Sequence, residues 1–484
     1  MVEIELKFQI PEARRHALLK ALDPKKAIQI PLKAKYYDTP ERHLAQSHAA
    51  LRQRLEGQIW VQTFKAARKN HIERFEHNVL LGEQEHAPDL DLSIYEQDAE
   101  AQMLLTQALA GNTQLGLQFE TDIQRTQRTL NFNASEIEIS LDVGHIRTPS
   151  AEQEVHEVEF ELKSGSIQDL LAFSFEWVKK YHLWLDVRSK AEIGNLLAQT
   201  QRVSPAVHAK EFVLVKKDSS EQNLRMLIAQ QLQHLLPNIA AMAANVATQA
   251  HIDQAQQALD HLQLTTALFK DWNKNLSDKF AIQLAAFKHQ FDHLQHLQHM
   301  QATLGSFLQN PKTKAQLEQD ILYSKEKLHN LVRSTLNVHH YLELLMFSLD
   351  DDHGQQQDLK SSAQHSLQLQ YKALQDQLNN TSMHDFEQLD LLAFRIHELK
   401  FSFPILTHIY DVKNLQKYSK ALNDASLAAA EYQILASSAT YIQQTELEAS
   451  DWFVLGWLTA KQEIYAERLI EATEQFLVSR KLIK

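Results

Sequence analysis

The chain has 484 residues, with 49 Lys and Arg against 61 Asp and Glu, a formal net charge of −12 and no cysteine. This length predicts two or three domains, each able to bury its own core, and the lack of cysteine excludes disulfides, thiolate zinc sites and cysteine nucleophiles. The negative charge argues against a general nucleic-acid binder, because phosphate contacts need clustered Lys and Arg. With no uncharged run long enough to span a bilayer and no leader before the first strand, we expect a cytoplasmic protein that binds neither membranes nor nucleic acid.

The first 200 residues are typical of an antiparallel β domain with a few helices. They hold seven of the ten glycines and six of the ten prolines, and short alternating apolar and polar runs lie between these turn signals. The predicted strands cover residues 2–9, 50–56, 59–66, 72–80, 118–130, 135–143 and 154–163, and the predicted helices cover residues 11–22, 98–110, 166–181 and 190–200. The segment Tyr36-Tyr-Asp-Thr39 before Pro40 has good turn chemistry and is open to that simpler interpretation.

Beyond about residue 220 the pattern changes to long stretches rich in Leu, Ala and Gln. Apolar residues there recur at spacings of three and four, as in Leu328, Leu331 and Val332, and only three glycines interrupt the region. This pattern predicts an antiparallel helical bundle. We therefore predict a β domain over residues 1–202, a linker over 203–218 and a helical domain over 219–484.

Two distant segments carry the same alternation of charged and apolar residues. The charged residues are Glu3, Glu5 and Lys7 in the first segment, and Glu157, Glu159, Glu161 and Lys163 in the second. In a strand, each set would lie on one face and the apolar residues on the other. One such strand is most often a solvated face, but two copies favour a shared polar interior. Carboxylates at this density repel one another unless a cation lies among them, and Mg²⁺ prefers such oxygen ligands.

Basic residues at strand spacing lie between these two acidic segments. They are Arg52, Arg54, Lys65, Arg74 and Arg125, and Arg188 and Lys190 follow the second acidic segment. If the strands close into a barrel, alternate residues point inward and the lumen holds both acids and cations. A chain of phosphates fits this arrangement, because a metal would bridge it to the acids and Arg would bind its oxygens in pairs.

A series of short motifs occurs in one order along this region. The motifs are Glu3-Ile-Glu-Leu-Lys7, Tyr36-Tyr-Asp-Thr39, Leu51-Arg-Gln-Arg54, Thr63-Phe-Lys65, Leu141-Asp-Val-Gly144, Glu157-Val-Glu-Phe-Glu-Leu-Lys-Ser-Gly165 and Ser189-Lys-Ala-Glu192. The series resembles the successive signatures of CYTH domains, the triphosphate tunnel metalloenzymes, over about residues 1–200. The resemblance implies an α+β protein whose N-terminal eight-stranded antiparallel β tunnel hydrolyses or rearranges triphosphates with Mg²⁺ or Mn²⁺.

The resemblance also implies roles for individual residues. The implied metal ligands are Glu3, Glu5, Glu157, Glu159 and Glu161; the implied substrate-binding residues are Lys7, Arg52, Arg54, Lys65, Arg74, Arg125, Arg188 and Lys190; the implied catalytic residues are Glu5, Lys7, Arg54 and Lys65. Glu76 and Asp142 are secondary candidates, and Arg188 has an alternative place outside the tunnel. The last motif departs from the family, because Ile193 stands where Arg is common.

The helical region resembles the CHAD module, which often follows CYTH in bacteria. The matching stretches are Arg395-Ile-His397-Glu-Leu-Lys400, Ala421-Leu-Asn-Asp424 and Trp457-Leu-Thr-Ala-Lys461, with His251 a counterpart in the first half. CHAD helices carry basic faces that bind polyphosphate, but residues 216–484 hold 24 Lys and Arg against 30 Asp and Glu. We therefore expect at most weak polyphosphate binding from an all-α, CHAD-like bundle.

These observations lead to one main functional hypothesis and two alternatives. The main hypothesis is a metal-dependent inorganic triphosphatase that hydrolyses tripolyphosphate to diphosphate and phosphate inside the tunnel. One alternative is a triphosphatase that acts on thiamine or nucleoside triphosphates. The other is a non-catalytic polyphosphate-binding scaffold, against which the intact acidic pairs argue, because a pure anion binder would gain from losing them.

Overall fold

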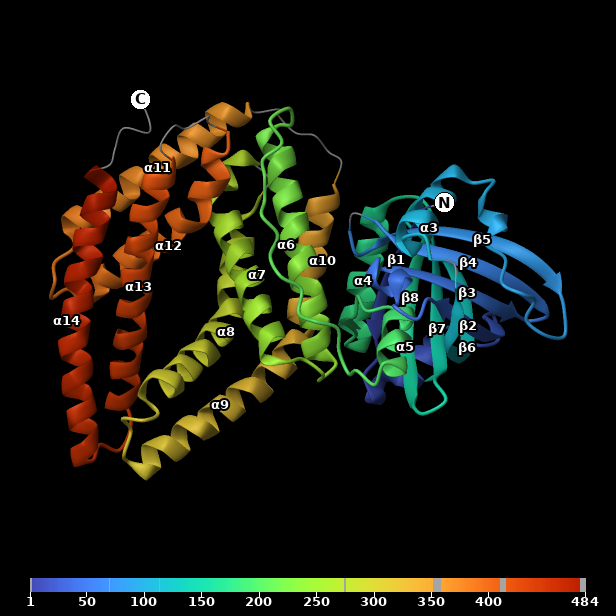
Figure 1. Cartoon of the computed structure of the whole chain (residues 1–484), viewed down its shortest axis with the longest axis horizontal. Coiled ribbons are helices and arrows are strands. Elements are labelled where there is room, and N and C mark those ends of the chain that lie inside the picture. The colour runs from blue at the N-terminus through green and yellow to red at the C-terminus, as the bar shows by residue number, and fades with distance from the viewer. Residues whose placement is uncertain are drawn as a thin grey trace. The chain divides into compact units, whose positions relative to one another are not determined.

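The structure, a computed structural model, shows an antiparallel β barrel followed by a helical region (Figure 1). The described residues are 2–68, 70–112, 114–273, 276–350, 358–409 and 415–478. The strands are β1 (Val2–Gln9), β2 (Ile28–Asp38), β3 (Ala49–Glu56), β4 (Ile59–Ala67), β5 (Glu73–Glu83), β6 (Gly116–Phe132), β7 (Ser135–Arg147), β8 (Glu152–Ser164) and β9 (Trp184–Leu185).

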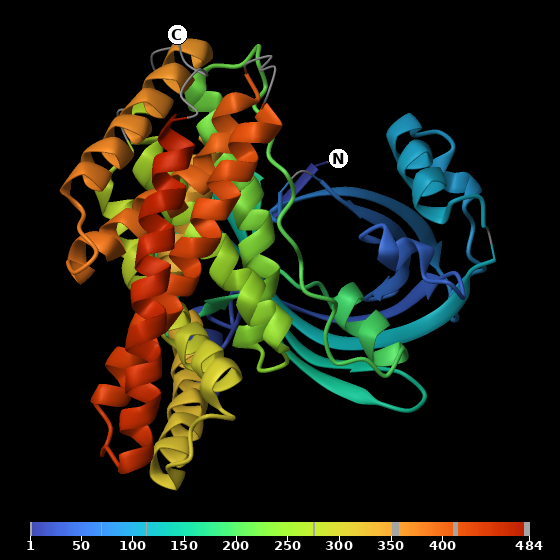
Figure 2. The same cartoon turned by 60° about the vertical axis from the view of Figure 1, so that its left-hand side comes forward.

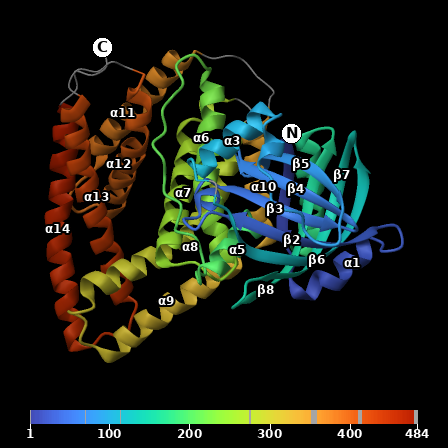
Figure 3. The ribbon, with the colours of Figure 1, turned by 45° about the vertical axis from the view of Figure 1, so that its right-hand side comes forward.

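Eight of these strands close on themselves. They pair in the order β5-β4-β3-β2-β6-β7-β8-β1, and β1 pairs back with β5, with Glu3 opposite Arg74. Figures 2 and 3 show the resulting ring of strands. The two-residue strand β9 pairs with the end of β1, where Phe8 lies opposite Leu185. The predicted eight-stranded antiparallel tunnel is therefore confirmed, and closure leaves the barrel with no long unpaired edge.

The helices near the barrel are α1 (Arg15–Ala21), α2 (His43–Gln46), α3 (Ala99–Leu109), α4 (Ile167–Tyr181) and α5 (Lys190–Ala198), and the short 3₁₀ turns η1 (Glu12–Arg14) and η2 (Ser93–Tyr95) accompany them. The outer face of β1 and β8 packs against α4. Phe8 and Phe160 have ring centroids 5.4 Å apart, and Phe160 lies 5.3 Å from Phe173 of α4. Because alternate strand residues point to opposite faces, the charged residues between these aromatics point into the barrel.

One barrel strand, β2, lies outside the predicted ranges. Pro31 interrupts it, and proline within a run argues against a strand because it donates no ladder hydrogen bond. The Tyr36–Thr39 motif is the end of β2, which finishes at Asp38, and the start of a turn in which the N–H of Arg42 donates to the carbonyl oxygen of Thr39 at 3.0 Å, before α2 begins at His43. Asp38 accepts hydrogen bonds from the backbone N–H groups of Leu44 (2.9 Å) and Ala45 (3.0 Å), which hold α2 against the strand end.

The rest of the described chain is helical, which confirms the predicted all-α region. Its helices are α6 (Ser220–Ala243), α7 (Gln249–Leu268), α8 (Asp278–Leu304), α9 (Pro311–Val332), α10 (Thr335–Leu349), α11 (Leu359–Asn380), α12 (Phe386–Thr407), α13 (Leu415–Gln443) and α14 (Ala449–Val478), with the 3₁₀ turn η3 (Lys270–Trp272). Every helix among the described residues is too short or too polar to cross a bilayer. The cytoplasmic location stays a prediction.

The chain divides into two compact units. The barrel unit comprises Met1–His208, Leu232–Ala255 and Asn330–Asp350, and the helical unit comprises Ala209–Gln231, Gln256–His329 and Asp351–Lys484. The barrel unit thus includes α10, where His339 contacts the carbonyl oxygen of Phe175 at 3.2 Å. In the helical unit, Tyr441 of α13 donates a 2.7 Å hydrogen bond to Asp320 of α9. The domain limits drawn from the sequence stay a prediction.

Candidate functional site

The two acidic segments are neighbouring strands of the barrel. β1 and β8 pair in antiparallel register, with Glu5 opposite Glu161 and Lys7 opposite Glu159. Their charged faces therefore form one continuous inner wall, to which β7 adds Asp142 opposite Glu157. This pairing brings together carboxylates that lie more than 130 positions apart in the sequence.

Three carboxylates on this wall form a compact acidic cluster. Asp142, Glu157 and Glu159 each offer one oxygen, and these oxygens all lie within 4.8 Å of one another. Among the described residues this is the group of acidic and histidine side chains close enough to hold a metal ion. Hard divalent cations prefer such oxygen ligands, so the donor set fits Mg²⁺ or a similar ion.

Lys190 and Arg125 make the shortest ion pairs with this cluster. The ammonium of Lys190 lies 2.7 Å from Asp142 and 2.8 Å from Glu159, and it also pairs with Glu157. The guanidinium of Arg125 donates two 2.7 Å hydrogen bonds to Asp142 and one of 2.7 Å to Glu159. Lys190 reaches the cluster from the first turn of α5, which the hydroxyl of Ser189 caps by accepting from the N–H of Glu192.

These cations keep Asp142 and Glu159 ionised. Burial acts to raise the pKa of Asp142 and of Glu159, but Arg125 and Lys190 more than offset it, so both pKa values lie below the ordinary range. The same carboxylates hold the pKa of Lys190 well above normal, although burial acts to lower it. The acids are thus unprotonated at neutral pH, as metal ligands must be.

A second group of charges lies where β1, β4 and β5 meet. Lys65 lies 2.5 Å from Glu3 and 3.0 Å from Glu76, and Arg74 lies 3.3 Å from Glu5. Burial raises the pKa of Glu3 to about 8, with Glu5 and Glu76 adding to the effect and Lys65 opposing it. Glu3 therefore holds its proton to higher pH than Asp142 and Glu159 do.

Glu161 differs from its neighbours on β8. Burial raises its pKa, and Lys163, which lies 2.8 Å away, opposes the effect. Lys163 also lies 3.4 Å from Glu138 of β7. Of the five predicted metal ligands, the structure thus groups Glu157 and Glu159 with Asp142, and it places Glu3, Glu5 and Glu161 in separate ion pairs.

The facing wall carries the arginines of β3. Arg54 is paired with Glu56 of its own strand, with its Nε donating at 2.7 Å. Arg52 lies 3.4 Å from the Tyr36 hydroxyl and 3.9 Å from Glu76, and although burial acts to lower its pKa, these neighbours raise it. Its Nε is buried and has no hydrogen-bond partner among the described residues. An anion in the lumen would supply that missing partner.

The remaining predicted cations lie at one end of the barrel or outside it. Lys7 donates to the carbonyl oxygen of Arg188 and lies 3.4 Å from Glu157. The Arg188 guanidinium pairs with Asp186 through two hydrogen bonds, of 2.9 and 2.8 Å. Arg128, which was not among the predicted site residues, stands three positions after Arg125 and so on the opposite, outer face of β6, where it donates to the carbonyl oxygen of Leu22.

Sequence reasoning missed two polar residues of this site. Gln9 donates to Glu157 at 3.3 Å and to Asp186 at 3.1 Å. Gln9 continues the period-two series that begins at Glu3, and Asp186 stands two residues before Arg188, so strand parity was the available signal. Asp142, ranked as secondary from the sequence, is a member of the acidic cluster.

Comparison with known proteins finds similarities to both the β region and the helical region. Residues 1–192 match the family model of the CYTH domain. An inorganic triphosphatase of Haemophilus influenzae is 31% identical over 191 residues, which are 38% of this chain and 51% of that protein, so the chain spans about half of that relative's length. The crystal structure of the CHAD domain from the plant Ricinus communis aligns over 58% of this chain and 99% of its own, with a TM-score of 0.50 and 12% identity.

The identity to the Ricinus domain is low, so this similarity speaks for the fold alone. For the barrel, the family match, the closed eight-stranded topology and the order of motifs agree. Residues 1–192 therefore match the CYTH domain, and the barrel that they form is fused to a helical region with the fold of a CHAD domain.

Proposed function

We propose that the protein is a metal-dependent inorganic triphosphatase that cleaves tripolyphosphate to diphosphate and phosphate inside the tunnel. One observation carries this proposal: the acidic cluster and Arg52, whose buried Nε has no hydrogen-bond partner among the described residues, belong to the inner walls of one closed barrel. Tripolyphosphate fits both, because it is a polyanion that binds arginine directly and carboxylates through a bridging metal ion. The activity of the Haemophilus influenzae relative supports the same substrate class.

We assign the metal site to Asp142, Glu157 and Glu159, with Mg²⁺ or Mn²⁺ as the ion. When bound, the ion would neutralise phosphate charge and polarise the phosphorus under attack. The ammonium of Lys190 now balances the charge of these acids. An ion held there would take over that role and leave the ammonium available to phosphate.

We assign the remaining cations to the phosphate oxygens. Arg52 and Arg54 bind from β3, and Lys7 and Arg125 bind from the side of the acidic cluster. Lys65, held between Glu3 and Glu76, is placed to balance charge that develops on the leaving phosphate.

We assign proton transfer to Glu5. Glu3 already holds a proton, because its pKa is raised to about 8, chiefly by burial. Glu5 lies two residues further along β1, on the same face. The Nε of Arg74 lies 3.3 Å from its carboxylate and orients it. A carboxylate in that position can accept the proton of the attacking water.

The test is phosphate release from tripolyphosphate, ATP, thiamine triphosphate and long-chain polyphosphate, with Mg²⁺, with Mn²⁺ and with EDTA. We expect the fastest turnover on tripolyphosphate, no turnover in EDTA, and an Asp142→Asn variant that needs at least about tenfold more metal for half-maximal rate, as expected when a metal site loses a partner. Glu136→Gln, an exposed carboxylate on the same strand, is the matched control. Metal-independent turnover, or faster cleavage of an organic triphosphate, would contradict the proposal; binding without turnover would indicate a scaffold.

A further inference from the structure

Arg333, between α9 and α10 in the barrel unit, is a cation without an acidic partner. Its Nε donates a 2.5 Å hydrogen bond to the carbonyl oxygen of Ala243, and its guanidinium lies 4.4 Å from the centroid of the Trp184 ring. Among the described residues, no carboxylate lies within ion-pair distance of it, and burial lowers its pKa with nothing to oppose the effect. A partly buried guanidinium in this state favours an anion beside it.

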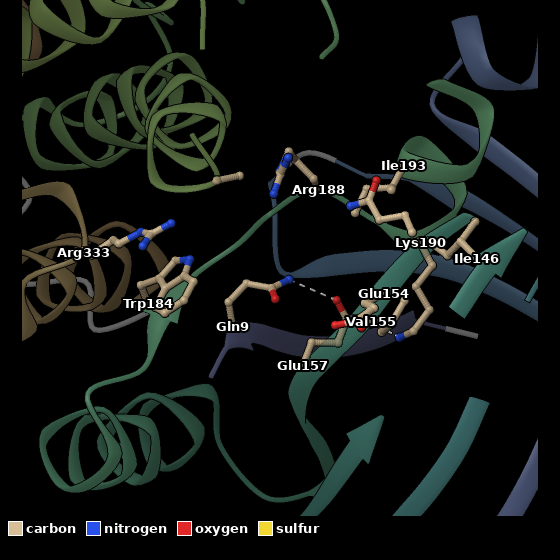
Figure 4. A pocket seen from close by; sticks show the side chains of 12 residues that line it. Gln9, Ile146, Glu154, Val155, Glu157, Trp184, Arg188, Lys190, Ile193 and Arg333 are labelled. Atoms are coloured by element: carbon tan, nitrogen blue, oxygen red, sulfur yellow. Dashed lines mark hydrogen bonds and ion pairs between the residues drawn. The ribbon is translucent and has the colours of Figure 1, made fainter. Parts of the chain in front are cut away.

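Arg333 lines a pocket that leads to the acidic cluster. The pocket has a volume of about 200 Å³, and its lining includes Gln9, Glu157 and Lys190 together with Arg333 (Figure 4). Glu157 and Lys190 belong to the acidic cluster and its counter-ion. A ligand held at that cluster could therefore extend directly toward Arg333.

The other cations of the pocket already have partners. Arg188 is paired with Asp186, and Lys190 contacts all three carboxylates of the acidic cluster. Arg333 is thus the lining cation whose charge is available to a ligand.

The size and lining of the pocket favour phosphate over an organic group. Its volume is below the roughly 300–1,000 Å³ of ordinary small-molecule sites. Trp184, the aromatic residue of the lining, is stacked against Arg333, so that ring face is covered. The exposed carboxylate of Glu154 lies at the same pocket and would repel an anion, so its removal should strengthen phosphate binding.

From this geometry we infer that Arg333 extends the tunnel's binding site to a further phosphate, so that chains longer than tripolyphosphate gain a contact there. The inference rests on the proposed function, because tripolyphosphate is taken to fill the site between the acidic cluster and the β3 arginines. It names linear polyphosphates of four or more units as an additional substrate class.

The experiment compares tetrapolyphosphate with tripolyphosphate for the native chain and for Arg333→Gln, Arg333→Lys and Glu154→Gln. We expect the ratio of KM for tetrapolyphosphate to KM for tripolyphosphate to rise about tenfold in Arg333→Gln, the value of one charge-assisted phosphate contact. Arg333→Lys should recover most of this loss because it keeps the charge. In Glu154→Gln the same ratio should fall.

A purely structural role for Arg333 predicts a different result. The KM values for both substrates would then rise by the same factor, and the melting temperature of the barrel would fall as well. An unchanged ratio of KM values in Arg333→Gln overturns the inference. Calorimetric binding of both phosphates to the Glu5→Gln chain, with metal present, gives the same ratio without turnover. If the native protein hydrolysed neither phosphate, the proposed function would be wrong. The ratio of Kd values would still decide whether Arg333 contacts the fourth phosphate.

Discussion

At the scale of single residues, burial and neighbouring charge decide which groups are ready for chemistry. Glu3 and Glu159 are both inward-facing glutamates, but burial dominates at Glu3, whereas Lys190 and Arg125 outweigh burial at Glu159. Their pKa values consequently move in opposite directions. Residue type and strand parity are the same for both, so these two properties do not distinguish the proton-holding acid from the ionised one.

His71 supplies a test of this reasoning away from the site. Burial lowers its pKa to about 4 and outweighs the contact with the carbonyl oxygen of Gln233, which acts to raise it; Arg74 and His48 lower it further by smaller amounts. Between pH 6.5 and 4 the unfolded chain therefore binds a proton that the folded chain does not, so stability falls as pH falls through this window. The expected loss is about 2 kcal/mol by pH 5, from 1.36 kcal/mol per pH unit.

The measurement is thermal unfolding of the barrel unit from pH 7.5 to 5 for the native chain and for His71→Gln. The glutamine amide keeps a donor for the Gln233 carbonyl but cannot take up a proton. We expect the native melting temperature to fall more steeply than that of the variant. Parallel slopes would show that His71 protonates equally in both states.

At the scale of elements, the contact between α5 and β6 sets the position of Lys190. Gly194 of α5 lies against the ring of Phe119, and a Cβ at this position would stand 2.2 Å from a ring carbon. Phe119 is itself stacked on Tyr36, with ring centroids 4.5 Å apart, so it has little room to move. The helix that carries Lys190 can therefore approach the barrel only because residue 194 lacks a side chain.

We expect Gly194→Ala to destabilise the barrel unit. Alanine favours a helix over glycine by about 1 kcal/mol, but overpacking against an aromatic ring costs roughly 1–3 kcal/mol and displaces α5. A lower melting temperature with weaker tripolyphosphate binding is the expected result, measured by calorimetry. Gly456→Ala in α14 is the control, because nothing lies within 4 Å of its added Cβ and only the propensity gain remains. An equal effect at both positions would refute the packing argument.

At the scale of the whole molecule, the compact units do not follow the order of the sequence. The barrel unit takes in α10 and the second half of α6. Asn238 of α6 bonds both the N–H and the carbonyl of Val207, and Arg333 stacks on Trp184. Segments distant in sequence thus cover barrel-side residues that the CYTH region alone would leave exposed.

A chain that ends at residue 208 should therefore fold less stably than the same barrel in the full protein. Removing α10 exposes the surface of α4 around Phe175, whose ring centroid now lies 5.1 Å from that of His339. We expect a melting temperature several degrees lower, since about 1 kcal/mol corresponds to roughly 2–4 °C in domains of this size. A chain that ends at residue 255 keeps the Asn238 contacts but lacks α10, so it should recover only part of the loss. Equal melting temperatures for all three chains in calorimetry would show that the barrel needs no helical cover.

The sequence by itself predicts the local alternation of charged and apolar residues and the type of secondary structure in each region. Period-two charge on β1 and β8 was readable because side-chain alternation is a property of each strand alone, and the change to spacings of three and four marked the helical region. Which charges meet was settled at the tertiary level. Asp142 joins Glu157 and Glu159 because β7 and β8 pair in one register, and Arg333 reaches the pocket beside Trp184 from a helix junction some 150 residues further along the chain. Register and long-range packing depend on the free energy of the whole fold, which no local spacing records.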